Sequence, residues 1–202
     1  MIKYSAGFFD AEGSVWIGKG GSAIVLRAQL VQRDHTILKM LQKHWSINSN
    51  LSNDKLIFNG QHARRFYAEI VSSLSIKKYE VELACKLDLE RYSRHKEETC
   101  SAWRNRIRDN ACNLNLEGTE LDMYTAGFLD GDGYISKIDQ HVRISQKLRH
   151  PLDRMSEVYG GQVYQRNDGI HQWTIWNAQA RRFLDKVRPY LLSPRHEFEW
   201  HR

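Results

Sequence analysis

A chain of 202 residues is long enough for one large domain or for two domains of about 100 residues each. Hydrophobic residues make up 41% of the chain, which excludes wholesale disorder, and no apolar run reaches the ~20 residues that cross a bilayer. The 30 lysines and arginines outnumber the 24 acids, and the resulting net charge of +6 favours a polyanionic partner such as nucleic acid.

The cysteines are odd in number and show no CxxC spacing, which argues against a disulfide framework and against a zinc ribbon; they are Cys85, Cys100 and Cys112. The apolar start of the chain meets an acid at Asp10, so it lacks the form of a secretory signal. These features predict an intracellular protein in a reducing compartment, and they do not distinguish an organelle from bacterial or phage-host cytoplasm.

The first predicted element is a short helix of small and apolar residues that ends at Gly13. Its sequence AGFFDAEG begins at Ala6 and returns as AGFLDGDG, which begins at Ala126, 120 residues further along the chain. One copy of so short a string is a moderate signal. Two copies at a domain-sized interval are a strong one.

Two more matches follow the motif in the same order. Gln32 corresponds to Gln146, and the ARRF at 63–66 corresponds to that at 180–183. Ordered matches at similar offsets indicate an internal duplication. We therefore predict two homologous halves, 1–95 and 121–202, joined by a polar linker over residues 96–120.

Two strands are predicted after each copy of the motif, because apolar residues alternate with other residues over 24–31 and 141–148. A helix follows, over 36–45 in the first half and over 151–159 in the second, where Pro151 suits a helix start. A second hairpin is clearest in the later half, where Asn-Asp-Gly at 167–169 has turn chemistry.

The ARRF segment forms the last predicted helix of each half, and a further helix is predicted over 79–95. Each half is thus predicted to be an αββαββα unit with one four-stranded antiparallel sheet. The fold class is α+β, with two pseudo-symmetric halves.

Physical chemistry gives the repeated motif two tasks. Its alanine and glycine lack bulk, so two helices that carry it can cross backbone to backbone. The crossing would place Glu12 and Asp132 side by side at helix C-termini, where a carboxylate is unfavourable by about 0.3–1 kcal/mol. Two carboxylates brought together repel each other further, and a cation relieves that repulsion.

Mg²⁺ suits such a site, since it binds one or two protein carboxylates together with substrate phosphates. The alternative interpretation is that the motifs are turns that end two helices and expose their acids. That alternative explains one copy, but it explains neither the small residues nor the duplication.

The pattern AG-Φ-Φ-D-x-[ED]-G, with Φ an apolar residue, resembles the LAGLIDADG signature in all but its first position, and it occurs twice. The chain is therefore similar to the single-chain, two-motif LAGLIDADG homing endonucleases. The resemblance covers nearly the whole chain outside the linker. It implies a monomer whose two sheets form a saddle over double-stranded DNA, with the motif helices crossing above the minor groove.

The function that the resemblance implies is intron mobility through site-specific DNA cleavage. Each half would cut one strand of a long asymmetric target by Mg²⁺-dependent phosphodiester hydrolysis, leaving short 3′ overhangs. Mn²⁺ or Ca²⁺ could occupy the same site. A metal-bound water would attack phosphorus in line, without a protein general base.

The resemblance also carries over individual roles. Glu12 and Asp132 would hold the metal, helped by the peptide carbonyls of Ala11 and Gly131. Gln32 and Gln146 would order water beside the scissile phosphates, and Lys77 would help to polarise the attacking water or the phosphate. In contrast, Asp10 and Asp130 are expected to accept hydrogen bonds from backbone near the helix ends.

One departure from the family pattern concerns the second half. The counterpart of Lys77 falls near Pro194, so the role passes to Arg195, one residue further on, or is lost. We therefore expect the two halves to differ in cutting rate.

Groove-reading side chains are expected at exposed strand positions, since arginine can grip guanine and glutamine can grip adenine. The alternative is an ordinary solvated sheet face. In the first half the candidates are Ser14, Trp16, Arg27 and Gln29. In the second half they are Ser136, Gln140, His141, Arg143, Tyr164, Arg166, Gln172 and Thr174. Because the two sets differ, the target should be asymmetric.

Other basic residues have two interpretations. The ARRF arginines, at 64, 65, 181 and 182, could touch phosphates, but salt bridges on a helix surface are favoured. The linker run Trp103, Arg104, Arg106 and Arg108 could lie along the DNA backbone or be solvated, and the sequence does not separate these.

Two competing functions remain open. An RNA maturase would use the same basic surface to assist the folding of its own intron RNA, and a silent regulator would bind DNA without cutting. The intact pair Glu12 and Asp132, together with Lys77, favours cleavage over both.

Overall fold

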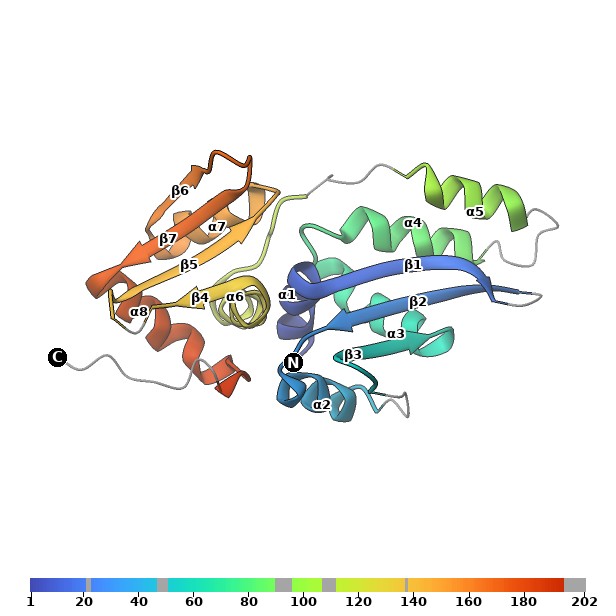
Figure 1. Cartoon of the computed structure of the whole chain (residues 1–202), viewed down its shortest axis with the longest axis horizontal. Coiled ribbons are helices and arrows are strands. Elements are labelled where there is room, and N and C mark those ends of the chain that lie inside the picture. The colour runs from blue at the N-terminus through green and yellow to red at the C-terminus, as the bar shows by residue number, and fades with distance from the viewer. Residues whose placement is uncertain (21–22, 47–50, 90–95, 107–111, 137, 195–202) are drawn as a thin grey trace.

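The computed structural model describes the chain except for residues 21–22, 47–50, 90–95, 107–111, 137 and 195–202. Two halves lie on either side of a central pair of helices, α1 (Ile2–Glu12) and α6 (Gly118–Asp132) (Figure 1). The predicted α+β fold with two antiparallel sheets is confirmed. No helix in the described part of the chain is long and apolar enough to cross a membrane.

The first half continues from α1 into a hairpin, β1 (Gly13–Gly20) and β2 (Ala23–Val31), and then into helix α2 (His35–His44). Strand β3 (Lys55–Asn59) pairs with β2, so the sheet order is β1-β2-β3, antiparallel throughout. The half ends with α3 (Gln61–Ile70), a 3-10 turn at Val71–Ser73, and α4 (Lys78–Leu89).

Four strands were predicted in this sheet, and the described residues form three. Ahead of β3 the chain makes only an isolated bridge between Ser52 and Lys55. Asn53 and Asp54 between them have positive φ values of 45° and 62°, the conformation of a tight hairpin turn. The turn is present, and residues 47–50, which precede it in the chain, lie outside the described residues.

The second half has all the predicted elements. After α6 come β4 (Gly133–Ile135), β5 (His141–Gln146), α7 (His150–Tyr159), β6 (Gln162–Gln165), β7 (His171–Trp176) and α8 (Asn177–Val187). A 3-10 turn, Arg188–Tyr190, follows. The four strands pair in the order β4-β5-β7-β6, again antiparallel. Gly169, with φ of +82°, lies in the predicted Asn-Asp-Gly turn before β7.

Part of the predicted linker is helical. Helix α5 (Lys96–Arg104) buries Trp103, and the Arg106 guanidinium lies 3.8 Å from the centre of the Trp103 ring. Arg106 also forms an ion pair of 2.6 Å with Glu80 on α4. Trp103 and Arg106 of the basic linker run therefore contact other parts of the protein. Arg108 lies outside the described residues.

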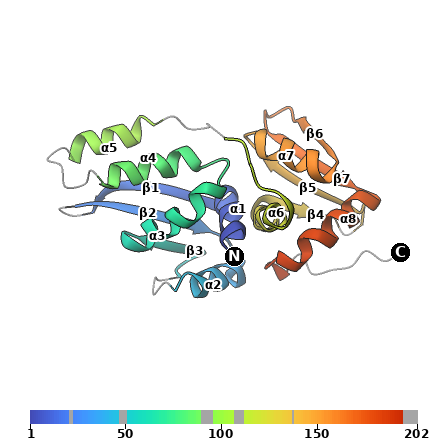
Figure 2. The same cartoon turned by 180° about the vertical axis from the view of Figure 1, so that it is seen from behind.

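Each sheet has its helices on one face and leaves the other face open, as the two opposite views show (Figures 1 and 2). Burial follows this division: Val15 and Ala28 point into the core, while the alternating Ser14 and Trp16 are exposed. Edge-on aromatic contacts tie the central helix to the first core, with Phe9 5.5 Å from Phe66 between ring centres. Both open faces therefore flank the central helix pair.

Candidate functional site

The two motif helices cross in direct backbone contact. A Cβ atom added to Gly7 would lie 1.9 Å from the carbonyl oxygen of Tyr124, and one added to Gly127 would lie 2.1 Å from the carbonyl oxygen of Tyr4. Any side chain at either glycine would overlap the opposite helix. The small residues of the motif therefore set the distance between the halves, as predicted from the sequence.

The same crossing brings the C-terminal ends of the helices together. Glu12 is the last residue of α1 and Asp132 the last of α6, and both side chains are half-buried. A Cβ atom added to Gly131 would lie 2.4 Å from Cβ of Ala11 and 3.0 Å from Cγ of Glu12. The two acids therefore sit at adjoining negative helix ends, an arrangement that attracts a cation.

The earlier acid of each motif is fully buried and bonded as predicted. Asp10 accepts hydrogen bonds from the backbone N–H groups of Ser75 (2.7 Å) and Lys77 (2.9 Å) and from the hydroxyl of Tyr124 (2.7 Å). Burial raises the pKa of Asp10, against the opposing effects of Lys77 and these donors. Its carboxylate is thus committed to holding the segment 75–77 on the helix end.

Asp130 has the equivalent place in the second half. Its carboxylate accepts hydrogen bonds from the hydroxyl of Tyr4 (2.7 Å) and from the backbone N–H groups of Leu192 (2.7 Å) and Ser193 (3.3 Å). Each aspartate therefore receives a tyrosine hydroxyl from the opposite motif helix.

Lys77 reaches the negative end of α1. Its ammonium donates to the carbonyl of Phe9 at 2.9 Å and also to the carbonyl of Asp10. Burial lowers the pKa of Lys77, while the negative charges of Asp10, Asp132, Glu80 and Glu12 act to raise it. A basic side chain thus lies within electrostatic reach of both acids that the sequence analysis singled out.

The second half has no described equivalent of that ammonium. Pro194 follows the two backbone donors to Asp130, in the place that Lys77 has after Ser75. Proline has no N–H and no charge. Arg195, the predicted substitute, lies outside the described residues.

The matched glutamines both reach the helix ends, but they bind different partners. Nε2 of Gln32 donates across the interface to the carbonyl of Asp130 at 3.2 Å. Nε2 of Gln146 donates to the carboxylate of Asp132 in its own half at 3.1 Å. Their Oε1 atoms accept from the following N–H groups, of Arg33 and Lys147, both at 2.8 Å.

The oxygen atoms at this site fit a hard cation shared with a ligand better than a closed metal cage. Among the described residues no group of three or more His, Cys, Asp or Glu side chains could hold a metal ion. Two carboxylates and nearby helix-end carbonyls suit Mg²⁺ when phosphate oxygens and water complete its shell.

On the first open face the four predicted side chains form two cross-strand pairs, Ser14 with Gln29 and Trp16 with Arg27. All four are at least partly exposed. Asn59 on β3 belongs to the same surface, since its Oδ1 accepts a hydrogen bond of 2.8 Å from Nε of Arg27. Sequence analysis missed Asn59, because its strand was not delimited there.

On the second open face Arg143 is exposed and pairs with Tyr134, a residue that the sequence analysis also missed. His141 lies on the same side of β5, with its ring 6.0 Å from that of Tyr134. Gln140 precedes the strand and accepts a 2.8 Å hydrogen bond from Arg181.

Three predicted groove positions are buried, so the expectation of exposure was wrong for them: Ser136, Gln172 and Thr174 are 3%, 8% and 4% exposed. Gln172 donates to Thr174 at 3.0 Å and to the hydroxyl of Tyr164, which is itself exposed. Ser136 instead bonds Asp139 at 3.2 Å. Polar side chains here satisfy one another, which alternation along a strand does not reveal.

Arg64 and Arg65 of the ARRF helix make ion pairs, as favoured from the sequence, and so does Arg166, which was predicted instead to read the DNA groove. Arg64 pairs with the buried Asp88, and Arg65 with Glu69 at 3.3 Å on the same helix. Arg166, at the β6–β7 turn, pairs with Asp168 at 2.9 Å.

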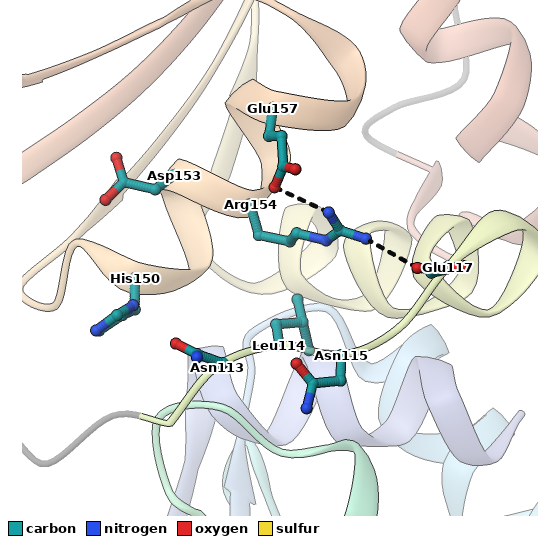
Figure 3. A pocket seen from close by; sticks show the side chains of 8 residues that line it. All are labelled: Asn113, Leu114, Asn115, Glu117, His150, Asp153, Arg154 and Glu157. Atoms are coloured by element: carbon teal, nitrogen blue, oxygen red, sulfur yellow. Dashed lines mark hydrogen bonds and ion pairs between the residues drawn. The ribbon is translucent and has the colours of Figure 1, made fainter.

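A separate hollow of about 670 Å³ lies between helix α7 and the chain leading into α6 (Figure 3). Arg154 spans it, reaching Glu157 at 2.8 Å, Glu117 at 3.8 Å and the carbonyl of Leu116 at 3.3 Å. With Asp153 the hollow has three carboxylates, which repel phosphate. Arg154 attaches the chain ahead of α6 to α7 in the second half. The carboxylates make the hollow a poor site for nucleic acid.

Comparison with solved structures reveals the fold. The chain superposes on I-AabMI, a LAGLIDADG meganuclease bound to uncleaved DNA, with a TM-score of 0.67 and 12% identity over 96% of this chain and 86% of that one. It is similar to I-GzeII, a LAGLIDADG homing endonuclease in complex with its DNA target (TM-score 0.65, 17% identity, 96% and 84% covered). It also matches I-LtrWI, bound to target DNA (TM-score 0.62, 18% identity, 94% and 86% covered).

No protein-family model and no curated protein matches the sequence. The fold that the two motifs predicted is nevertheless confirmed in both halves, with the acids at the helix crossing.

Proposed function

We propose that this chain, which has the two-motif LAGLIDADG homing endonuclease fold, is a site-specific endonuclease that cuts both strands of a long asymmetric DNA target. The observation that carries the proposal is the pair Glu12 and Asp132 at adjoining helix ends, between two open sheet faces. One acid per half, at a pseudo-twofold interface, matches the need to cut two antiparallel strands.

The donor set suggests how the site would work with DNA bound. Glu12 and Asp132 would hold Mg²⁺, or Mn²⁺ or Ca²⁺ in its place, and the carbonyls of Ala11 and Gly131 would add oxygen ligands. A divalent cation at such a site supplies an activated water and stabilises negative charge on the leaving oxygen. We propose that each cut leaves a 3′ hydroxyl, and that the two cuts are staggered to give short 3′ overhangs.

The remaining residues would act on charge and orientation. Lys77 places its ammonium beside the helix end of Glu12, where it attracts phosphate and opposes the charge that develops during hydrolysis. Gln32 and Gln146 keep an amide N–H at the helix ends, where each can orient water. Asp10 and Asp130 act only by fixing the segments around them.

The partner proposed is double-stranded DNA, bound by the open sheet faces. The net charge of +6 and the exposed Arg143 and partly exposed Arg27 support this. Because α1 and α6 belong to one chain and form the whole crossing, one molecule holds both acids, which supports a monomer.

The test is a search for cut ends. The purified chain is incubated in Mg²⁺ with a library of random duplex DNA and with genomic DNA, and the new ends are sequenced. Glu12→Gln and Asp132→Asn are assayed beside it, with Asp153→Asn as a matched control because that carboxylate is exposed on α7.

Recurrent paired ends with short 3′ overhangs, seen with the wild type and the control and absent from both site variants, are expected. Tight binding with no ends above background would contradict the endonuclease proposal. RNA-stimulated intron splicing by the same preparation would then favour a maturase, and binding alone would favour a regulator.

A further inference from the structure

Among the described residues, each open sheet face has one arginine that lies over an aromatic ring. In the first half the guanidinium of Arg27 lies 5.0 Å from the centre of the Trp16 ring. In the second half that of Arg143 lies 4.4 Å from the centre of the Tyr134 ring. Trp16 and Tyr134 are 38% and 48% exposed, so both stacks face solvent on the surfaces proposed to bind DNA.

The two stacks are not at equivalent positions. Counting from the motif, Gly133 pairs with Ile144 and the next pair is Tyr134 with Arg143. In the first half the corresponding pair after the motif glycine is Ser14 with Gln29, and the stack occurs two residues later.

The second-half stack is therefore two residues nearer the helix crossing. Two residues of strand span about 6.6–6.8 Å. Along duplex DNA, with about 3.4 Å between steps of one strand, that distance corresponds to roughly two base pairs.

Neither stack is duplicated. The second-half counterparts of Trp16 and Arg27 are Ser136 and His141, and Ser136 is buried. The asymmetry is therefore built into the side chains of the two sheets, whose backbones follow the same plan.

Stacking prepares each guanidinium for base reading. A ring against one face fixes the plane of the guanidinium and leaves the N–H edge available. Nε of Arg27 donates to Oδ1 of Asn59 at 2.8 Å, which leaves the two terminal nitrogens for another acceptor. Arg143 has no hydrogen-bond or ion-pair partner among the described residues. Two parallel N–H groups match O6 and N7 of guanine in the major groove.

We infer that Arg27 and Arg143 each read one guanine, and that the guanine read by Arg143 lies about two base pairs nearer the centre of the target. This inference rests on the proposed function. It assigns a base to two of the predicted groove-reading residues and adds a spacing that the target must show.

The experiment selects duplexes that the full chain binds from a random library in Ca²⁺, an ion present with I-SmaMI on its uncleaved DNA target. The wild type is compared with Arg27→Ala and Arg143→Ala, because a lysine could itself bind O6 and N7 of guanine. Arg182→Ala is the control, since that arginine is exposed on α8, on the helix-covered side of the sheet.

The wild-type motif is expected to contain one guanine on each side of its centre, at distances that differ by about two base pairs. Arg143→Ala should lower the preference for the inner guanine by about 5- to 150-fold, and Arg27→Ala should do so for the outer one. Arg182→Ala should leave both preferences unchanged. The loss of a phosphate contact would weaken binding to all sequences about equally, so a preference lost at one position identifies base reading.

Guanines at equal distances, or preferences that survive in both alanine variants, would overturn the inference while leaving the endonuclease proposal intact, provided that the wild type still cuts in Mg²⁺. If no motif is enriched and no DNA is cut, the proposed function fails, and the inference fails with it.

Discussion

The first half holds its motif helix with a lysine, and the second half has a proline at the matching place. Lys77 donates to the helix-end carbonyl of Phe9, whereas Pro194 offers neither an N–H nor a charge. The residues around this position are otherwise similar in the two halves. Both halves have a buried motif aspartate, a tyrosine that reaches the opposite aspartate, and a glutamine at the helix end.

The shared features serve the interface, and the unshared ones serve one half alone. Tyr4 bonds the aspartate of the second half, and Tyr124 that of the first, so losing either residue affects both halves. Lys77, Arg27 and Arg143 instead have different residues at the matching places of the other half, which are Pro194, His141 and Gln29. The structure is thus symmetric where the halves depend on each other and asymmetric where each would meet its own stretch of DNA.

The largest expected effect comes from removing the acids one at a time. Glu12→Gln and Asp132→Asn should each lower double-strand cutting by about 1,000-fold or more, because metal-assisted charge stabilisation contributes several kcal/mol. If the halves cut separate strands, each variant should leave a nick in the opposite strand, mapped by end-labelled duplex. The same nicked strand in both variants would contradict the assignment of one acid to each strand.

Substitution of the two crossing glycines tests whether Gly7 and Gly127 contribute equally to the stability of the helix interface. Gly7→Ala and Gly127→Ala should each lower the free energy of unfolding by about 3 kcal/mol, because the added methyl would overlap a carbonyl of the opposite helix. Chemical denaturation measures both. A loss in only one variant would show that the helix pair adjusts on one side.

Lys77 and Pro194 provide a matched exchange. Lys77→Met should slow the strand cut by the first half by about 100-fold and leave the other strand near its wild-type rate, since one charge-stabilising group is lost. Pro194→Lys should speed the slower strand of the wild type. Strand-specific rates on a labelled target decide the matter, and equal slowing of both strands by Lys77→Met would mean that the lysine serves the whole site.

The sequence predicted the two crossing helices and the acids at their ends, because both belong to a repeated local motif. The motif acids and the two glutamines lie at or beside the ends of the motif helices. Each of these residues occurs once in each half, so the repeat is visible in a single sequence. The DNA-facing surface was less predictable. Tyr134 and Asn59 belong to this surface because they pair across strands with Arg143 and Arg27. The register of that pairing cannot be read from the sequence.

Burial was also hidden from the sequence at polar strand positions. Gln172 and Thr174 alternate as exposed residues should, yet they bond each other in a network that excludes solvent. The helix α5 was missed for a different reason. Its polar surface resembles a linker, and its packing depends on one buried tryptophan, Trp103.

The smallest expected effect tests the crossed tyrosines. Tyr4→Phe and Tyr124→Phe each delete one hydroxyl that donates at 2.7 Å to a fully buried carboxylate. A hydrogen bond to a charged group contributes about 2 kcal/mol, so each variant should lose about that much free energy of unfolding. The double variant should lose the sum, because each tyrosine bonds a different aspartate. A double variant no less stable than either single one would mean that the two aspartates act as one coupled unit across the crossing, and that the halves do not fold around separate anchors.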